Sequence, residues 1–154
     1  MGDDKNCIDS RIYPSMECGD ALIHSNDLYH GVGNSLTGTR WTLIIFINSR
    51  IDYYMKDLDT KINSYDRSAY ENHIESKVMS NNLCDKIVEE TKKHKWTKKR
   101  HLNYPTTDIP VKTMSISVNV NNYVKDNVFP YIEKHYGVDK NFIKINDLFV
   151  VKYN

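Results

Sequence analysis

A short run of almost uninterrupted apolar residues constrains the fold of this chain most: residues 41–47, with the sequence WTLIIFI. Its residues are mainly β-branched or aromatic and do not alternate with polar ones, which is typical of a strand buried on both faces. A second apolar run, DLFVVKY at residues 147–153, predicts another strand. The first run is far too short to cross a bilayer as a helix. The rest of the chain is therefore expected to cover a buried sheet.

Two further stretches have the apolar spacing of helices. The first covers residues 81–94, where Asn81 or Asn82 is expected to cap the helix. The second covers residues 120–136 and ends before a glycine, and Pro130 inside it predicts a kink or a break. Between them, two prolines make residues 103–110 an extended segment. The inner face of the first helix is expected to consist of Leu83, Cys84, Ile87 and Val88.

The middle of the chain is more polar. Apolar residues recur at helical spacing in 51–62, which predicts one amphipathic helix, whereas 63–80 has no strong apolar face. The pair His73 and Glu75 has the spacing of two metal ligands but is expected to be a solvated helical pair. Together with the flanking strands, these patterns predict an α+β fold.

Composition excludes several classes of function. The chain has 154 residues, 40% of them hydrophobic, and a formal charge of +1, which suits one domain and gives no field that attracts nucleic acid or an anionic membrane. The basic residues in 92–100 are expected to be a solvated helix end and loop. Residues 1–6 are acidic and polar with no apolar stretch after them, so no signal peptide is expected, and a cytoplasmic or virus-encoded protein is favoured.

The cysteines support neither a zinc knuckle nor a disulfide framework. There are three of them, Cys7, Cys18 and Cys84, and no Cys-x-x-Cys occurs. Free thiols in a reducing compartment are favoured, and a pairing of Cys7 with Cys18 across a short loop is the alternative.

The spacing between His30 and Arg40 carries the chemistry. A neutral imidazole at a strand end can ligate a transition metal. A guanidinium ten residues later can return beside it on the next strand and bind a carboxylate at two points. Gly38 would allow the backbone to make that return. Alone, this pattern is more often a loop histidine and a surface ion-pair partner.

The surrounding residues strengthen the pattern. The sequence from Gly19 to His24, then His30, then Arg40 before an apolar strand resembles the last strands of the 2-oxoglutarate and iron(II)-dependent dioxygenase barrel. The resemblance implies that His30 is the distal iron ligand and that Arg40 pairs with the far carboxylate of 2-oxoglutarate. His24 is expected to line the strand.

A second, separate resemblance covers residues 81–153. The words Pro-Thr-x-Asp-Ile, at 105–109, and Phe-Val-Val-Lys-Tyr, at 149–153, are similar to those that open the catalytic domain of procollagen lysyl hydroxylases. In that family the tyrosine that ends this strand borders the 2-oxoglutarate pocket. The resemblance therefore implies a cosubstrate role for Tyr153.

Two departures from the family shape the expected organisation. Residues 1–50 resemble the end of a dioxygenase domain, 51–80 a partly helical connector and 81–154 the beginning of a lysyl-hydroxylase-like domain, so the order is reversed. The His-x-Asp pair that supplies two of the three iron ligands does not occur in the sequence. The expected fold is an incomplete double-stranded β-helix, or jelly roll, with flanking helices. The order fits a slice of a tandem protein or a split gene product, with a circular permutation that lost its middle as a further alternative.

The resemblance implies an Fe(II)/2-oxoglutarate dioxygenase of the peptidyl-lysine hydroxylase type that uses ascorbate and acts on a collagen-like or other lysine-containing peptide. Because the His-x-Asp ligands are absent, the chain is expected to be an inactive fragment when alone. The alternatives are a non-catalytic binding or assembly module that pairs with a complete dioxygenase or with the missing part of its own domain, a prolyl-hydroxylase-type relative, and an unrelated α+β protein. Partners among nucleic acids and membranes are not expected.

Overall fold

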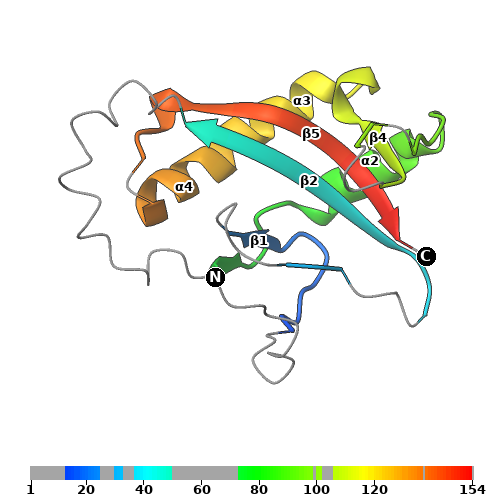
Figure 1. The fold of residues 1–154 in the computed structure, drawn as a ribbon, viewed down its shortest axis with the longest axis horizontal. Coiled ribbons are helices and arrows are strands. Elements are labelled where there is room, and N and C mark those ends of the chain that lie inside the picture. The colour runs from blue at the N-terminus through cyan, green and yellow to red at the C-terminus, as the bar shows by residue number, and fades with distance from the viewer. Residues whose placement is uncertain are drawn as a thin grey trace.

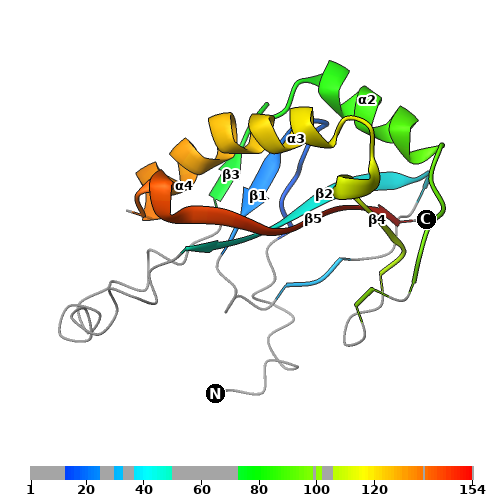
Figure 2. The same ribbon diagram turned by 90° about the horizontal axis from the view of Figure 1, so that it is seen from above.

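The fold combines a small antiparallel sheet with helices that lie along one side of it (Figures 1 and 2). The expected mixture of helices and strands is therefore confirmed. None of the helices in the described part of the chain has the length and apolar character needed to cross a membrane. The computed structural model describes residues 13–24, 30–32, 37–49, 73–98, 100–101, 106–136 and 138–153.

Two long strands form the centre of the sheet. β2 (Arg40–Ser49) and β5 (Ile143–Tyr153) pair antiparallel, and the short β4 (Asp108–Pro110) pairs with the other edge of β5. The register places Arg40 opposite Tyr153 at one end and Ser49 opposite Ile143 at the other. Both strands predicted from their apolar runs are present, and both extend beyond those runs. The expected burial of residues 41–47 on both faces is wrong, because β2 lies at the edge of the sheet and Phe46 is 47% exposed.

The pairing of β2 with β5 contains one irregularity. The register shifts between Phe46, opposite Asp147, and Ile47, opposite Ile145, so Asn146 has no partner. Side chains of a strand alternate between the two faces, and an extra residue reverses the alternation. Ile145 therefore faces the helices as Leu148 does, although an uninterrupted strand would turn them to opposite faces.

The first long helix, α2 (Asn81–Thr91), is capped one residue earlier than predicted and ends three residues before the predicted end at 94. Its N-cap is Ser80, whose hydroxyl accepts a hydrogen bond from the Leu83 N–H at 3.3 Å, rather than Asn81 or Asn82. Serine is among the best N-cap residues because its short side chain reaches the unpaired N–H groups of the first turn. Ile87 of the predicted inner face is buried, and Leu83 packs against the same core.

The predicted kink near Pro130 takes the form of a π-turn. Two α-helices, α3 (Ser117–Tyr123) and α4 (Phe129–Tyr136), are joined by the π-helical residues Val124–Val128, where the Phe129 N–H bonds to the Val124 carbonyl. Proline has no N–H, and its ring collides with the carbonyl four residues earlier in a regular α-helix. The wider π-turn and the position of Pro130 in the first turn of α4 accommodate both features.

The core lies between these helices and one face of the sheet. Val120 and Val124 are fully buried on the helical side, and Leu148 and Val150 are buried on β5. Burial of such side chains is the main favourable term in folding. Two 3-10 turns (Val111–Thr113 and Lys140–Phe142) connect the helices to the strands.

A separate two-stranded ribbon corrects one prediction. β1 (Ala21–Ile23) pairs antiparallel with β3 (His73–Glu75), so the His73 and Glu75 pair lies in a strand and not in a helix. Weak helical periodicity in a polar segment does not report a partner strand more than fifty residues away. The helix predicted for 51–62 lies outside the described residues.

Val120→Ala tests the position of the core. The substitution removes two buried methyl groups and leaves a cavity, so we expect the free energy of unfolding to fall by about 2 kcal/mol. Val118→Ala is the matched control, because Val118 lies on the same helix with 65% of its surface exposed, and it should change stability by less than about 0.5 kcal/mol. Urea unfolding measures both, and equal losses would contradict the assigned core.

Candidate functional site

Two of the residues named from the sequence lie side by side. Arg40 begins β2 and Tyr153 ends β5, and the register makes them direct cross-strand partners. The guanidinium carbon of Arg40 lies 4.9 Å from the centre of the Tyr153 ring. Figure 1 shows the two strand ends together at one side of the sheet. The strand pairing therefore joins residues from distant parts of the sequence.

The pair suits an anionic ligand. Arg40 is exposed, and no carboxylate of the described residues forms an ion pair with it. Partial burial raises the pKa of Tyr153, and the neighbouring Arg40 guanidinium lowers it by a smaller amount. The phenol therefore keeps its proton at neutral pH and can donate a hydrogen bond beside a fixed positive charge. A guanidinium and a phenol together match the oxygen atoms of a carboxylate.

The predicted iron ligand lies beside another histidine. His30 is exposed, and its ring centre lies 4.2 Å from that of His24, which follows β1. Imidazoles are common ligands of transition metals, so this pair can contribute two nitrogen atoms to a metal site. In the part of the chain that the structure describes, no group of three metal-ligating side chains is formed. The structure thus joins Arg40 with Tyr153 and His30 with His24.

A polar cluster lies at the end of the sheet near β4. Asp108 is completely buried, and its carboxylate accepts a hydrogen bond from Thr106 at 2.8 Å. The Arg100 Nε lies 3.5 Å from Asp108, and the same guanidinium pairs with Asp147. His101 Nε2 lies 3.6 Å from Asp108 and 3.9 Å from Asp147. Each acid therefore faces a cationic or polar group.

The geometry of this cluster favours a structural role. Arg100 lies between two carboxylates and already supplies the positive charge that a metal ion would bring. Its guanidinium also lies 5.1 Å from the centre of the Phe149 ring, which holds it against the sheet. A buried carboxylate needs such a partner because the loss of its hydration is costly.

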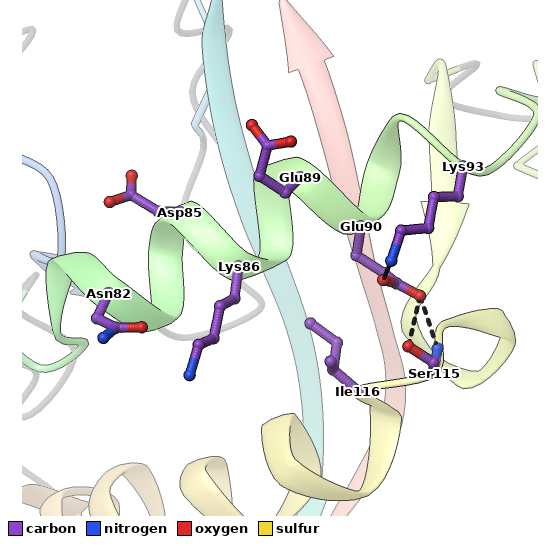
Figure 3. A pocket seen from close by; sticks show the side chains of 8 residues that line it. All are labelled: Asn82, Asp85, Lys86, Glu89, Glu90, Lys93, Ser115 and Ile116. Atoms are coloured by element: carbon purple, nitrogen blue, oxygen red, sulfur yellow. Dashed lines mark hydrogen bonds and ion pairs between the residues drawn. The ribbon is translucent and has the colours of Figure 1, made fainter.

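An open groove of about 530 Å³ lies between α2 and the turn before α3 (Figure 3). Its lining mixes acidic and basic side chains, and the most buried of them, Glu90, is already engaged. Glu90 accepts hydrogen bonds from the Ser115 N–H at 2.9 Å and hydroxyl at 2.8 Å, and it pairs with Lys93 at 2.7 Å. These bonds lower the Glu90 pKa to about 2, with the Lys93 bond contributing most. Glu90 therefore fastens α2 to the following turn.

Sequence reasoning missed the inward orientation of Arg100. This residue ends the basic segment that was expected to be solvated, yet its side chain is only 22% exposed and reaches Asp147 on β5. The spacing of Arg100 and Asp147 carries no signal, because their contact depends on the pairing of β4 with β5. The buried Asp108 could have been suspected only from its place inside a segment constrained by prolines.

Removal of Asp108 tests the structural role of the cluster. Asp108→Ala leaves the Arg100 guanidinium and the Thr106 hydroxyl without a buried partner, so we expect a loss of about 3–5 kcal/mol of unfolding free energy. Asp126→Ala, at an exposed position, is the control and should cost less than about 0.5 kcal/mol. Chemical denaturation distinguishes the two. A small effect of Asp108→Ala would mean that Asp147 alone satisfies Arg100.

Glu90→Gln tests the origin of acid sensitivity. Because the folded-state pKa of Glu90 lies near 2 and its ordinary value near 4.5, its stabilising contribution is complete above pH 4.5 and is lost as pH falls toward 2. The variant should be less stable than the parent at neutral pH, and the difference should shrink through that window. Glu89→Gln, which alters an exposed ion pair on the same helix, serves as the control. Unfolding midpoints of the parent and of Glu90→Gln, measured as pH falls from 4.5 toward 2, test this prediction. A difference in stability that does not change with pH would contradict the role assigned to Glu90.

Comparisons with other proteins give no family assignment. No family model, no curated protein and no solved structure matches this chain. The candidate site is therefore defined by its residues and their geometry alone. The strongest feature of that geometry is the exposed guanidinium of Arg40 against the phenol of Tyr153.

Proposed function

We propose that this chain is related to the 2-oxoglutarate and iron(II)-dependent dioxygenases, nearest the lysyl hydroxylases, and that Arg40 and Tyr153 bind 2-oxoglutarate. The observation that carries the proposal is the contact between these two side chains across β2 and β5. Two separate resemblances, one around Arg40 and one around Tyr153, assign both residues to the same cosubstrate pocket. Their position as direct partners supports that common role.

The chemistry of the pair suits a dicarboxylic acid. Arg40 would bind the far carboxylate of 2-oxoglutarate at two points, and the Tyr153 hydroxyl would donate to the same end of the ligand. The ring of Tyr153 also limits the rotation of the guanidinium, which lowers the entropy lost on binding. We infer that this end of the sheet is the anchoring end of the cosubstrate pocket.

The arrangement of strands supports an incomplete jelly roll. The resemblance places β2 at the end and β5 at the beginning of a barrel domain, and these two strands pair along their length. A barrel has no free edges, so strands far apart in sequence must pair where it closes. The helices cover one face of the sheet, and Arg40 and Tyr153 lie on the other, as residues of a barrel interior would.

An iron(II) site requires more protein ligands than His30 and His24. We propose His30 as the distal ligand of iron(II), with His24 beside it. Non-haem iron of this class needs three protein ligands, and His-x-Asp does not occur in the sequence. When iron, 2-oxoglutarate and O₂ are bound, with ascorbate as reductant, they supply the chemistry that hydroxylates lysine in a collagen-like peptide. We therefore propose that these 154 residues bind the cosubstrate but do not catalyse hydroxylation by themselves.

A second candidate function is that of a binding or assembly module. β2 lies at the edge of the sheet, and no strand of the described residues pairs with its outer side. Phe46 on this strand is 47% exposed. An exposed apolar edge strand readily pairs with another chain, which suits a protein that completes its barrel with a dioxygenase partner.

A titration with 2-oxoglutarate tests the leading proposal. Arg40→Ala should weaken binding about tenfold to a hundredfold, because a hydrogen-bonded charge pair contributes about 1.5–3 kcal/mol. Tyr153→Phe should weaken it by less, because a single neutral donor is lost. Calorimetry measures both, with Lys144→Ala as the matched control, since Lys144 is an exposed cation at the other end of β5.

Added iron(II) separates the two candidate functions. The chain is expected to release no succinate from 2-oxoglutarate with iron(II) present, and His30→Ala should weaken iron binding without changing the effect of Arg40→Ala. If the chain does not bind 2-oxoglutarate, or if Arg40→Ala binds it equally well, the proposed cosubstrate pocket is contradicted. The binding or assembly module then remains as the candidate function. Succinate formation that depends on His30 would overturn the proposed lack of activity.

A further inference from the structure

The turn that contains Cys18 is docked onto the segment before α2. The Gly19 carbonyl accepts a hydrogen bond from the Met79 N–H at 2.9 Å. The Asp20 carboxylate accepts one from the Lys77 N–H at 3.0 Å. These two contacts, one to a backbone carbonyl and one to a carboxylate, hold the residues that follow Cys18 in place. The position of Cys18 relative to α2 is therefore defined.

Gly19 is needed for this close approach. Its φ is +91°, and a Cβ atom there would lie 2.1 Å from the Met79 carbonyl oxygen, which is closer than any side chain permits. The other residue near that position is Asn81, whose Oδ1 lies at 3.8 Å. Only glycine can adopt this backbone conformation without strain and leave room for the contact.

The same approach brings the neighbouring cysteine to Cys84. Residues three positions apart lie on the same face of a helix, so Cys84 projects from the face of α2 that carries Asn81. Asn81 adjoins Gly19, so Cys18, the residue before Gly19, lies near the first turn of α2. The Cys18 thiol is close enough to Cys84 to contribute to the raised pKa of the Cys84 thiol.

We propose that Cys18 and Cys84 form a redox-active dithiol that closes to an intramolecular disulfide and links the segment before β1 to α2. The pair lies far from Arg40 in sequence and takes no part in the proposed cosubstrate pocket, so the inference does not rest on that function. It also differs from the Cys7–Cys18 pairing considered from the sequence. Cys7 lies outside the described residues.

The reaction is thiol–disulfide exchange with a small-molecule disulfide. The Cys18 thiolate attacks one sulfur of the disulfide, forms a mixed disulfide and releases the first thiol. The Cys84 thiolate then attacks the Cys18 sulfur, which forms the protein disulfide and releases the second thiol. The two protein thiols lose two electrons and two protons in total, and the reagent disulfide gains them.

The surroundings assign the order of the two steps. Cys18 is exposed and open to the reagent, whereas Cys84 is partly buried. Burial raises the pKa of Cys84 to about 11, and the adjacent Cys18 thiol adds to this effect. Since the thiolate is the attacking form, Cys18 reacts first and Cys84 resolves the mixed disulfide. Closure fastens β1, and with it His24, to the helical layer.

Oxidation of the reduced full chain by oxidised glutathione tests the proposal. After alkylation of the remaining thiols, non-reducing peptide mass spectrometry should find a Cys18–Cys84 linked peptide in the parent and in Cys7→Ser, and dithiothreitol should remove it. Cys84→Ser should lose the linked peptide and retain glutathione on Cys18. A parent chain that links Cys7 to Cys18, or that keeps glutathione on Cys18, would overturn the proposal.

Two controls separate the folded geometry from chance pairing. In denaturant the Cys7–Cys18 link should predominate, because its loop is roughly six times shorter and loop closure favours it by about 15-fold. Gly19→Ala should slow the Cys18–Cys84 link about tenfold by lowering the effective concentration of one thiol at the other. Gly31→Ala, at a position with open space and ordinary backbone, should not. If folded and unfolded chains gave the same ratio of the Cys18–Cys84 disulfide to the Cys7–Cys18 disulfide, the proposal that the fold brings Cys18 to Cys84 would be refuted.

Discussion

The antiparallel pairing of β2 with β5 is the constraint on which the rest of the structure depends. It joins strands from opposite parts of the sequence along ten residues of β2. Pairing over such a distance costs loop-closure entropy, which the burial of both strands must repay. The helices then pack on the face that the paired strands present, and β4 adds to the free edge of β5. Without this pairing neither the core nor the proposed site would form.

The two faces of the sheet differ in the polar side chains that they carry. The face toward the helices carries aliphatic side chains such as Leu148 and Val150, which are almost completely buried. The other face carries buried Phe149 and Val151 together with the polar groups, with Asp108 and its partners at one place and Arg40 with Tyr153 at the end of the strands. The first of these polar sets is buried, and its charges are paired within the chain by Arg100 with Asp108 and Asp147. The second retains an exposed guanidinium, and this difference makes it the better candidate for ligand binding.

Local patterns in the sequence predicted the elements better than their partners. Continuous apolar runs predicted β2 and β5, and helical spacing predicted α2 and the helix around Pro130, because these signals depend on neighbouring residues alone. The cap at Ser80 was missed by one position, since serine and asparagine cap helices almost equally well. The strand at His73 was missed because its partner, β1, lies far away in sequence.

The candidate site shows the same difference between residues, which local patterns can single out, and their partners, which they cannot. Arg40, Tyr153 and His30 were each named from residues near them, and the spacing predicted only that Arg40 returns beside His30. The pairing of Arg40 with Tyr153 depends on register, which no local pattern contains. The contact between Arg100 and Asp147 shows the same limit, because a basic segment gives no sign that its last member turns inward. The contacts of Arg40 with Tyr153 and of Arg100 with Asp147 were therefore not predictable from local patterns.

The bulge at Asn146 explains how one strand can serve both the core and the site. The apolar residues of β5 fall into two sets, Ile143 with Ile145 and Leu148 with Val150, which are out of phase in a regular strand. The extra residue brings both sets to the helices, and it does so at the end of the pairing remote from Tyr153. The part of β5 from Asp147 onward therefore keeps one alternation. A slip by one residue there would bury Tyr153 against the helices and separate it from Arg40, so the core itself holds this pair in register.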